Sequence, residues 1–223
     1  PSTTRPGTVC GAPLDAAGDH TMSCNYGGYK TYRHSRLVAK LRAILREAGC
    51  RVAPREVEVP GWRRPDGRGT RLEVSYVEDG ARHFADVSIR SPYRADLLAQ
   101  AAAGDGVAAR RGEEDKLADY PAVPDAGLDA VQPFVLESFG RLGQCAQDML
   151  RHLRQRLAEE APHLRGWAGH ALYNRWLAQL SVALQESHFA SAQAAWGCGG
   201  APLEVWQRPA ELVAPLVWAV LPF

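Results

Sequence analysis

The chain has 223 residues, of which 46% are hydrophobic and 23% are charged, as in ordinary globular proteins. This length favours one main domain with a small appendage. The longest uncharged apolar stretch, residues 212–223, is too short to cross a bilayer, and a basic leader followed by a long apolar core is missing. We therefore expect no membrane partner and no secretion.

Charge is unevenly distributed along the chain, although the net charge is only +1. Residues 1–111 contain 18 Lys and Arg against 12 Asp and Glu, whereas the remaining residues contain 8 against 13. Such a split predicts a basic face that could bind phosphate groups. Five cysteines, an odd number, favour free or metal-bound thiols in a reducing intracellular compartment over a disulfide framework.

The first half of the chain predicts an appendage, a helix and three strands. Residues 1–30 lack an apolar period, while apolar residues from Thr31 to the stop at Gly49 follow helical spacing with a basic outer face. Strand-like runs follow at 51–59, 71–78 and 83–89, the first broken by Pro60-Gly61. Asp79-Gly80 is typical of a two-residue hairpin turn between the last two runs.

The second half predicts mainly helices. Residues 94–109 are expected to be partly helical, and residues 113–120 to form a short charged helix ended by Pro121. A fourth strand is expected at 133–136. Two long helices are expected after it, at 138–160 and 166–195. The order predicts an α+β or mixed α/β fold, with a central sheet flanked by helices.

A possible zinc site lies near the start of the chain, at Cys10, His20, Cys24 and His34. Zinc favours thiolate and imidazole ligands, and a metal would replace the core that residues 1–30 lack. Alternatively, the cysteines are buried thiols and the histidines surface groups. His34 could equally face a phosphate or an active site, because it lies at the start of the first helix.

A second constellation combines Asp66, Asp86 and Lys116. Asp86 is an acidic residue within a strand of Val and Ile, so its side of the strand faces a cleft, water or a cation. Two carboxylates brought close together would suit Mg²⁺, and a lysine could position a water for phosphodiester hydrolysis. The simpler alternative is a solvent-facing Asp86, Asp66 in a turn, and Lys116 paired with Glu113 on an exposed helix.

The predicted hairpin adds Glu73 to this constellation. If Asp79-Gly80 is a two-residue turn, Glu78 pairs with Ala81, and the same register sets Glu73 opposite Asp86. Glu73 is therefore a candidate metal ligand, or a rival to Asp66 for that role. The alternative is an exposed pair of acidic residues across two strands.

Six motifs in order resemble the restriction-like endonuclease of site-specific non-LTR retrotransposon polyproteins, a branch of the PD-(D/E)xK nucleases. Over about residues 8–140, they are the Cys/His cluster, Arg33-His34, a Glu before the strand break, Arg64-Pro65-Asp66, Asp86-Val87-Ser88 and Lys116-x3-Tyr120. In this branch the catalytic lysine comes from the helix after the strand, consistent with Ser88 at the usual lysine position.

The resemblance implies roles for these residues. Asp66 and Asp86 would hold Mg²⁺ or Mn²⁺, Lys116 would serve the attacking water, and Tyr120 would share its face. It also implies three regions: a zinc-knuckle-like appendage at 1–34, a nuclease core at 35–140 and a helical scaffold or docking region at 141–223. The chain departs from the family in lacking a cysteine just before Cys10 and in the longer gap from Asp66 to Asp86.

The expected function is therefore nicking of DNA to leave a 3′-hydroxyl primer for reverse transcription, in the nucleus or elsewhere inside the cell. Expected partners are DNA and the remainder of a polyprotein that contains the reverse transcriptase. Two rivals are a DNA-binding module of this fold that has lost cleavage, and a protein-interaction domain. Candidate phosphate contacts are Arg36, Lys40, Arg63, Arg64, Arg68 and Arg71.

Overall fold

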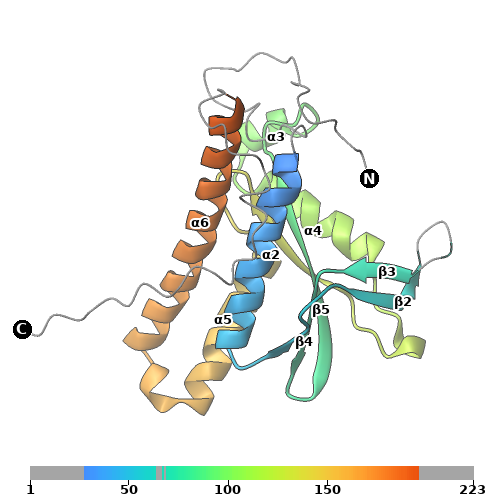
Figure 1. The fold of residues 1–223 in the computed structure, drawn as a ribbon, viewed down its shortest axis with the longest axis vertical. Helices are drawn as coiled ribbons and strands as arrows, with labels where there is room; N and C mark the ends of the chain where they lie inside the picture. The colour runs from blue at the N-terminus through green and yellow to red at the C-terminus, as the bar shows by residue number, and fades with distance from the viewer. Residues whose placement is uncertain (1–27, 64–66, 68, 196–223) are drawn as a thin grey trace, which may run out of the picture.

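The computed structural model describes residues 28–63, 67 and 69–195, which form a mixed α/β fold (Figure 1). Its main sheet has four strands in the order β1 (Arg51–Val52), β4 (Val74–Glu78), β5 (Ala81–Arg90) and β6 (Gln132–Glu137). The first three strands run antiparallel, and β6 lies parallel to β5. Strands β2 (Val57–Arg63) and β3 (Gly69–Leu72) form a separate antiparallel ribbon that extends from the main sheet.

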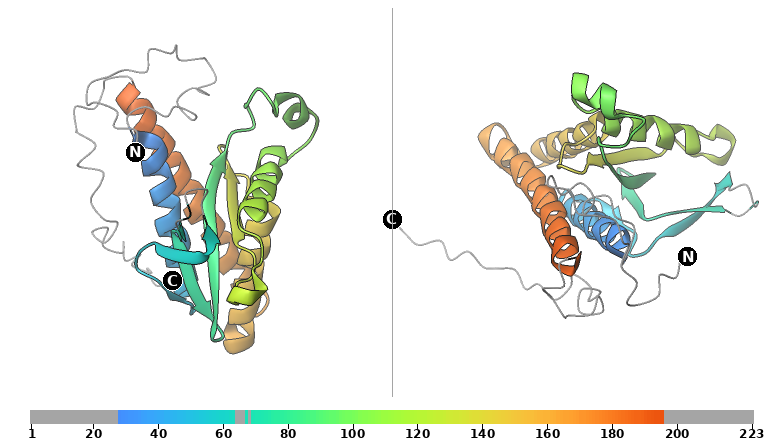
Figure 2. Two further views of the ribbon diagram at one scale, coloured as in Figure 1. Left: turned by 90° about the vertical axis from the view of Figure 1, so that its right-hand side faces the viewer. Right: turned by 90° about the horizontal axis from the view of Figure 1, so that it is seen from above.

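Helices connect and cover these strands. They are α2 (Tyr29–Glu47), α3 (Leu98–Ala103), α4 (Val107–Asp119), α5 (Gln144–Glu160) and α6 (Trp167–Ala195). In the sequence, helices α3 and α4 connect β5 to β6, because two parallel strands that pair with each other require a long crossover connection. Figure 2 shows α2 and α6 on one side of the sheet and α4 on the other. None of the helices within the described ranges is long and apolar enough to cross a membrane.

Alternation along the strands sends apolar side chains to one face of the sheet. Val74, Tyr76, Ala85 and Val87 are at most 2% exposed and share one core with α2, α5 and α6. The opposite face carries Asp86, and α4 approaches it closely at Gly112. A Cβ atom at residue 112 would lie 2.9 Å from the Arg90 side chain, so glycine permits this close packing.

The hairpin turn is the one predicted from the sequence. Asp79 and Gly80 both have positive φ, at 48° and 84°, as a two-residue turn that matches the strand twist requires. Glu78 pairs with Ala81, and the register continues to Val74 and Ala85. The predicted pairing is therefore confirmed from Glu78 to Val74, but the predicted pair of Glu73 with Asp86 does not form, because Glu73 lies in a bend before β4.

Several predicted element boundaries were wrong. The run at 51–59 is divided between β1 and β2, and the helix expected at 113–120 is the second half of α4, which begins at Val107. Pro60-Gly61 does not end a strand but lies within β2, where the pairing with β3 is irregular between Val59 and Arg63. The run at 71–78 is divided at Glu73 between β3 and β4, which belong to different sheets. The helix expected from residue 138 begins at Gln144, because residues 138–143 form a connection in which Gly140 has a φ of 94°.

Candidate active site

The candidate site lies where β4 separates from β5. The last pair between these strands is Val74 with Ala85; beyond it, the chain before β4 belongs to the β2–β3 ribbon, while β5 continues beside β6 alone. Glu73 lies at this point of divergence, and the next residue of β5 is Asp86. The split between two sheets thus leaves one side of β5 unpaired next to two acidic residues.

Lys116 contacts Asp86 directly. Its Nζ donates a hydrogen bond of 2.8 Å to Asp86 Oδ2, and the two side chains are only 18% and 10% exposed. Lys116 comes from α4, the second helix after β5, so the structure brings together two residues 30 positions apart that the sequence had assigned to one site. The alternative of a solvent-facing Asp86 is wrong, because this residue is 7% exposed.

Tyr120 lies beneath the ammonium group of Lys116. The centre of its ring is 5.7 Å from Lys116 Nζ, within the range of a cation–π interaction. The ring also packs against Trp62, whose indole donates a 2.7 Å hydrogen bond to the Pro121 carbonyl. Trp62 belongs to a second apolar cluster, separate from the main core, together with Leu72 and Phe84, and Tyr120 packs against it. This cluster attaches the ribbon to the end of α4. Tyr120 therefore supports the side of the site that carries Lys116.

Glu73 and His34 form the opposite side of the site. His34 Nε2 donates a 2.9 Å hydrogen bond to the Val87 carbonyl and lies 3.7 Å from Glu73 Oε2. Burial raises the pKa of Glu73, His34 lowers it and the Asp86 carboxylate raises it further. The bend at Glu73 is fixed from α2, because both Nε and Nη2 of Arg42 donate to the Glu73 carbonyl. Two acidic residues therefore interact across the divergence of the strands.

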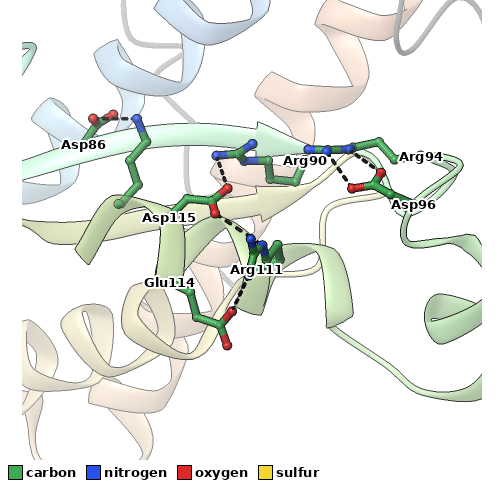
Figure 3. A network of polar contacts seen from close by, with 8 residues as sticks. Asp86, Arg90, Arg94, Asp96, Arg111, Glu114 and Asp115 are labelled. Carbon is green, nitrogen blue, oxygen red and sulfur yellow. Dashed lines mark hydrogen bonds and ion pairs between the residues drawn. The ribbon is translucent and has the colours of Figure 1, made fainter. Parts of the chain in front are cut away.

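A cleft of about 810 Å³ opens beside these residues. Its lining contains one acidic residue, Glu73, and several basic or potentially basic ones: Lys30, Arg33, His34, Arg90, Arg94 and Lys116. Arg90 forms a 3.2 Å ion pair with Asp115 on α4, and Arg94 pairs with Asp96 at 2.8 Å (Figure 3). The cleft thus combines Glu73, at the divergence of the strands, with basic side chains on other parts of its wall.

Several cleft residues were missed by sequence reasoning. Arg90 could have been found, because strand alternation sets it on the same face of β5 as Asp86. Lys30 and Arg33 could not be assigned to the cleft from the sequence, because their position depends on how α2 packs on the sheet. Glu137, at the end of β6, anchors the start of α4, because its Oε1 accepts hydrogen bonds from the backbone N–H groups of Ala108 and Ala109.

The predicted DNA contacts are spread over the molecule. Arg36 on α2 forms an ion pair with Glu186 on α6, and Arg71 on the ribbon pairs with Glu56 at 3.1 Å. Arg63 donates to the Gly67 carbonyl, whereas Lys40 is a half-buried residue of α2. Arg64, Asp66 and Arg68 lie outside the described residues.

Neither predicted metal site is complete in the part of the chain that the structure describes. Within it, no group of three or more His, Cys, Asp or Glu side chains is arranged to hold a metal ion. Cys10, His20 and Cys24 lie outside the described ranges, as does Asp66. His34 lies in the cleft with Glu73, which favours the alternative that it serves an active site rather than the zinc site.

Comparison with models of protein families and with curated proteins finds no match to this chain.

Proposed function

We propose that this protein is a divalent-metal-dependent DNA endonuclease of the restriction-like PD-(D/E)xK class. The observation that carries the proposal is the 2.8 Å contact between Lys116 and the buried Asp86 carboxylate, with Glu73 alongside. A lysine and acidic groups that converge in a basic cleft are suited to hydrolysis of a phosphodiester. The order of elements also supports this class, since an antiparallel hairpin, a helix carrying the lysine and a parallel strand follow one another.

The donor set fits Mg²⁺ or Mn²⁺. Both ions favour carboxylate oxygens, and Glu73 and Asp86 would hold the cation. A cation here would relieve the interaction through which Asp86 raises the pKa of Glu73. Asp66 remains a candidate for a further ligand. When bound, such a cation polarises a phosphate oxygen and lowers the pKa of a coordinated water.

The chain's own residues would orient the reaction. Lys116 would donate hydrogen bonds to the attacking water or to a phosphate oxygen, and Tyr120 would keep its ammonium group in place. Arg90 and Arg94 would contact neighbouring phosphates of the bound strand. In-line attack by water would break the phosphorus bond to the 3′ oxygen of the preceding sugar or to the 5′ oxygen of the next one; we propose the former, which leaves a 3′-hydroxyl and a 5′-phosphate.

The wider biological assignment follows the resemblance of the motifs. We propose that the nick supplies a primer to a reverse transcriptase in the same polyprotein, and that the reaction takes place on nuclear DNA. Zinc binding by Cys10, His20 and Cys24 stays a prediction. A specific observation favours His34 as a residue of the nuclease cleft: its Nε2 already donates to the Val87 carbonyl.

The test is nicking of a supercoiled plasmid in Mg²⁺ or Mn²⁺, with EDTA as the metal-free control. We expect the wild type to produce open circles and Asp86→Asn to produce none. Glu114→Gln is the matched control, because Glu114 is an exposed acidic residue of α4 that pairs only at the surface with Arg111. An intact plasmid with the wild type, together with an unchanged mobility shift in Asp86→Asn, would favour a module that binds DNA without cleaving it.

A further inference from the structure

Two large aromatic side chains are exposed beside the cleft. Tyr93 follows β5 and Phe139 follows β6, and the two side chains are 48% and 49% exposed. Their rings meet edge to face, with centroids 5.3 Å apart. Because β5 and β6 are parallel, the segments that follow them emerge at the same edge of the sheet. The pair is thus built from two segments separated by more than forty positions.

The segments that carry this pair are joined to each other and to the cleft. Ser138 donates its backbone N–H to the Arg90 carbonyl at 2.9 Å, and the Tyr93 N–H donates to Ser91 Oγ at 3.2 Å. Ser91, Arg94 and Ser138 all line the cleft, so the residues next to each aromatic ring form part of its wall. The aromatic pair therefore lies at the rim of the basic cleft.

Exposed aromatic rings next to positive charge are suited to unpaired nucleic acid. Bases stack on aromatic side chains whatever their sequence, while cations follow the phosphate backbone. Lys30, an exposed residue of α2, and Arg94, which pairs with Asp96, are basic residues that line the same cleft. Bases in a duplex are already stacked on their neighbours, so the rings can receive only a base that has left the helix.

We propose that Tyr93 and Phe139 form a stacking subsite for an unpaired nucleotide of the DNA strand bound in the cleft. This inference rests on the proposed nuclease function and narrows its substrate to DNA that is single-stranded, or opened, beside the scissile phosphate. Figure 3 shows Asp86, Arg90 and Arg94 in a row along β5 and the segment after it. The four-residue step from Asp86 to Arg90 within β5 spans about 13 Å, and Tyr93 lies beyond the end of this strand, so the stacked base would lie a few nucleotides from the hydrolysed bond.

The test measures binding in EDTA, where no cleavage is possible, with the full chain and a short oligonucleotide that contains a fluorescent adenine analogue. Single-stranded and duplex forms of the same sequence are compared by fluorescence anisotropy and by quenching of the analogue. Tyr93→Ala and Phe139→Ala are expected to weaken single-strand binding about tenfold and to reduce quenching. Both variants should bind the duplex as the wild type does, and Tyr93→Phe should retain single-strand binding.

Trp167→Ala is the matched control, since Trp167 is 84% exposed at the start of α6. The proposal is overturned if both alanine variants bind and quench the single strand as the wild type does. It is also overturned if single-strand and duplex affinities fall together, because that pattern indicates general loss of the basic surface. An inactive wild type in the nicking assay would refute the nuclease, but these binding results would still decide whether the aromatic pair stacks a base.

Discussion

Lys116 Nζ lies 2.8 Å from Asp86 Oδ2, across the interface between α4 and β5. This contact links α4, which follows the antiparallel strands in the sequence, to the part of β5 that extends beyond its pairing with β4. Glu137, through the backbone N–H groups of Ala108 and Ala109, holds the other end of the same helix. The lysine is therefore directed to the carboxylate by the packing of α4.

Glu73 is expected to be required for metal binding. Glu73→Gln removes one of two carboxylates at the divergence of the strands, and we expect a loss of nicking activity of at least about a hundredfold. Asp66→Asn tests the rival assignment, and Glu58→Gln on the ribbon is an exposed control. Activity that survives Glu73→Gln but not Asp66→Asn would refute the role of Glu73.

The pH dependence of nicking should reflect the raised pKa of Glu73. Only the ionised carboxylate binds a cation, so metal affinity should fall with decreasing pH at a higher pH than for an ordinary glutamate. Because protons and metal compete, raising the Mn²⁺ concentration should move the acid limb of the activity profile to lower pH. If the acid limb of the pH–activity profile stays at the same pH at every Mn²⁺ concentration, competition between protons and metal at Glu73 is refuted.

Arg42 is expected to position Glu73. Its guanidinium donates to the Glu73 carbonyl through two nitrogens and to the Pro54 carbonyl at 3.1 Å. Arg42→Met should lower the free energy of unfolding by about 1–3 kcal/mol, since these acceptors lose charged donors, and should reduce nicking. Arg46→Met, one turn further along the exposed side of α2, is the control in thermal unfolding. Equal effects of the two substitutions would argue against a specific role for Arg42.

His188 is expected to make stability depend on pH. Burial and the nearby Arg33 guanidinium together lower its pKa to about 4, although the ring donates a 2.8 Å hydrogen bond to the Ser138 carbonyl, which acts in the opposite direction. A histidine kept neutral in the folded state contributes stability above its unfolded pKa of about 6.5, and this contribution is lost as the pH falls toward 4.

The expected loss is of the order of 3 kcal/mol across this window, from the size of the shift. His188→Gln should flatten the dependence of the unfolding free energy on pH between 6.5 and 4, measured in urea. His163→Gln, which changes an exposed histidine after α5, should leave the slope as in the wild type. A slope unchanged in both variants would show that His188 does not titrate in this range.

The parts of the site that local chemistry determines were predictable from the sequence. Asp79-Gly80 fixes a two-residue turn, the turn fixes the register of the hairpin, and the register ends with Val74 opposite Ala85, so that Glu73 and Asp86 are the next residues on the two segments. The division of the run at 71–78 was not predictable in this way. Leu72, Val74 and Tyr76 are all buried and keep perfect alternation, yet Leu72 belongs to one apolar cluster and the other two to another. Alternation indicates which side chains are buried, but it does not indicate which of the two apolar clusters contains them.

The basic wall of the cleft also required the folded structure. Arg33 lies on α2 and bonds His188 on α6, which in turn bonds the Ser138 carbonyl after β6. This contact joins three elements that are far apart in the sequence and fixes residues on two sides of the cleft. The aromatic pair has the same origin, because Tyr93 and Phe139 meet only through the parallel pairing of β5 and β6.

The most direct test of the central claim is plasmid nicking by Asp86→Asn, Lys116→Met and the double variant, under identical Mg²⁺ conditions. If the two residues act as one catalytic unit, each single variant should lose nearly all activity and the double variant should lose little more. Full activity in either single variant, or losses that multiply in the double variant, would contradict the proposed site.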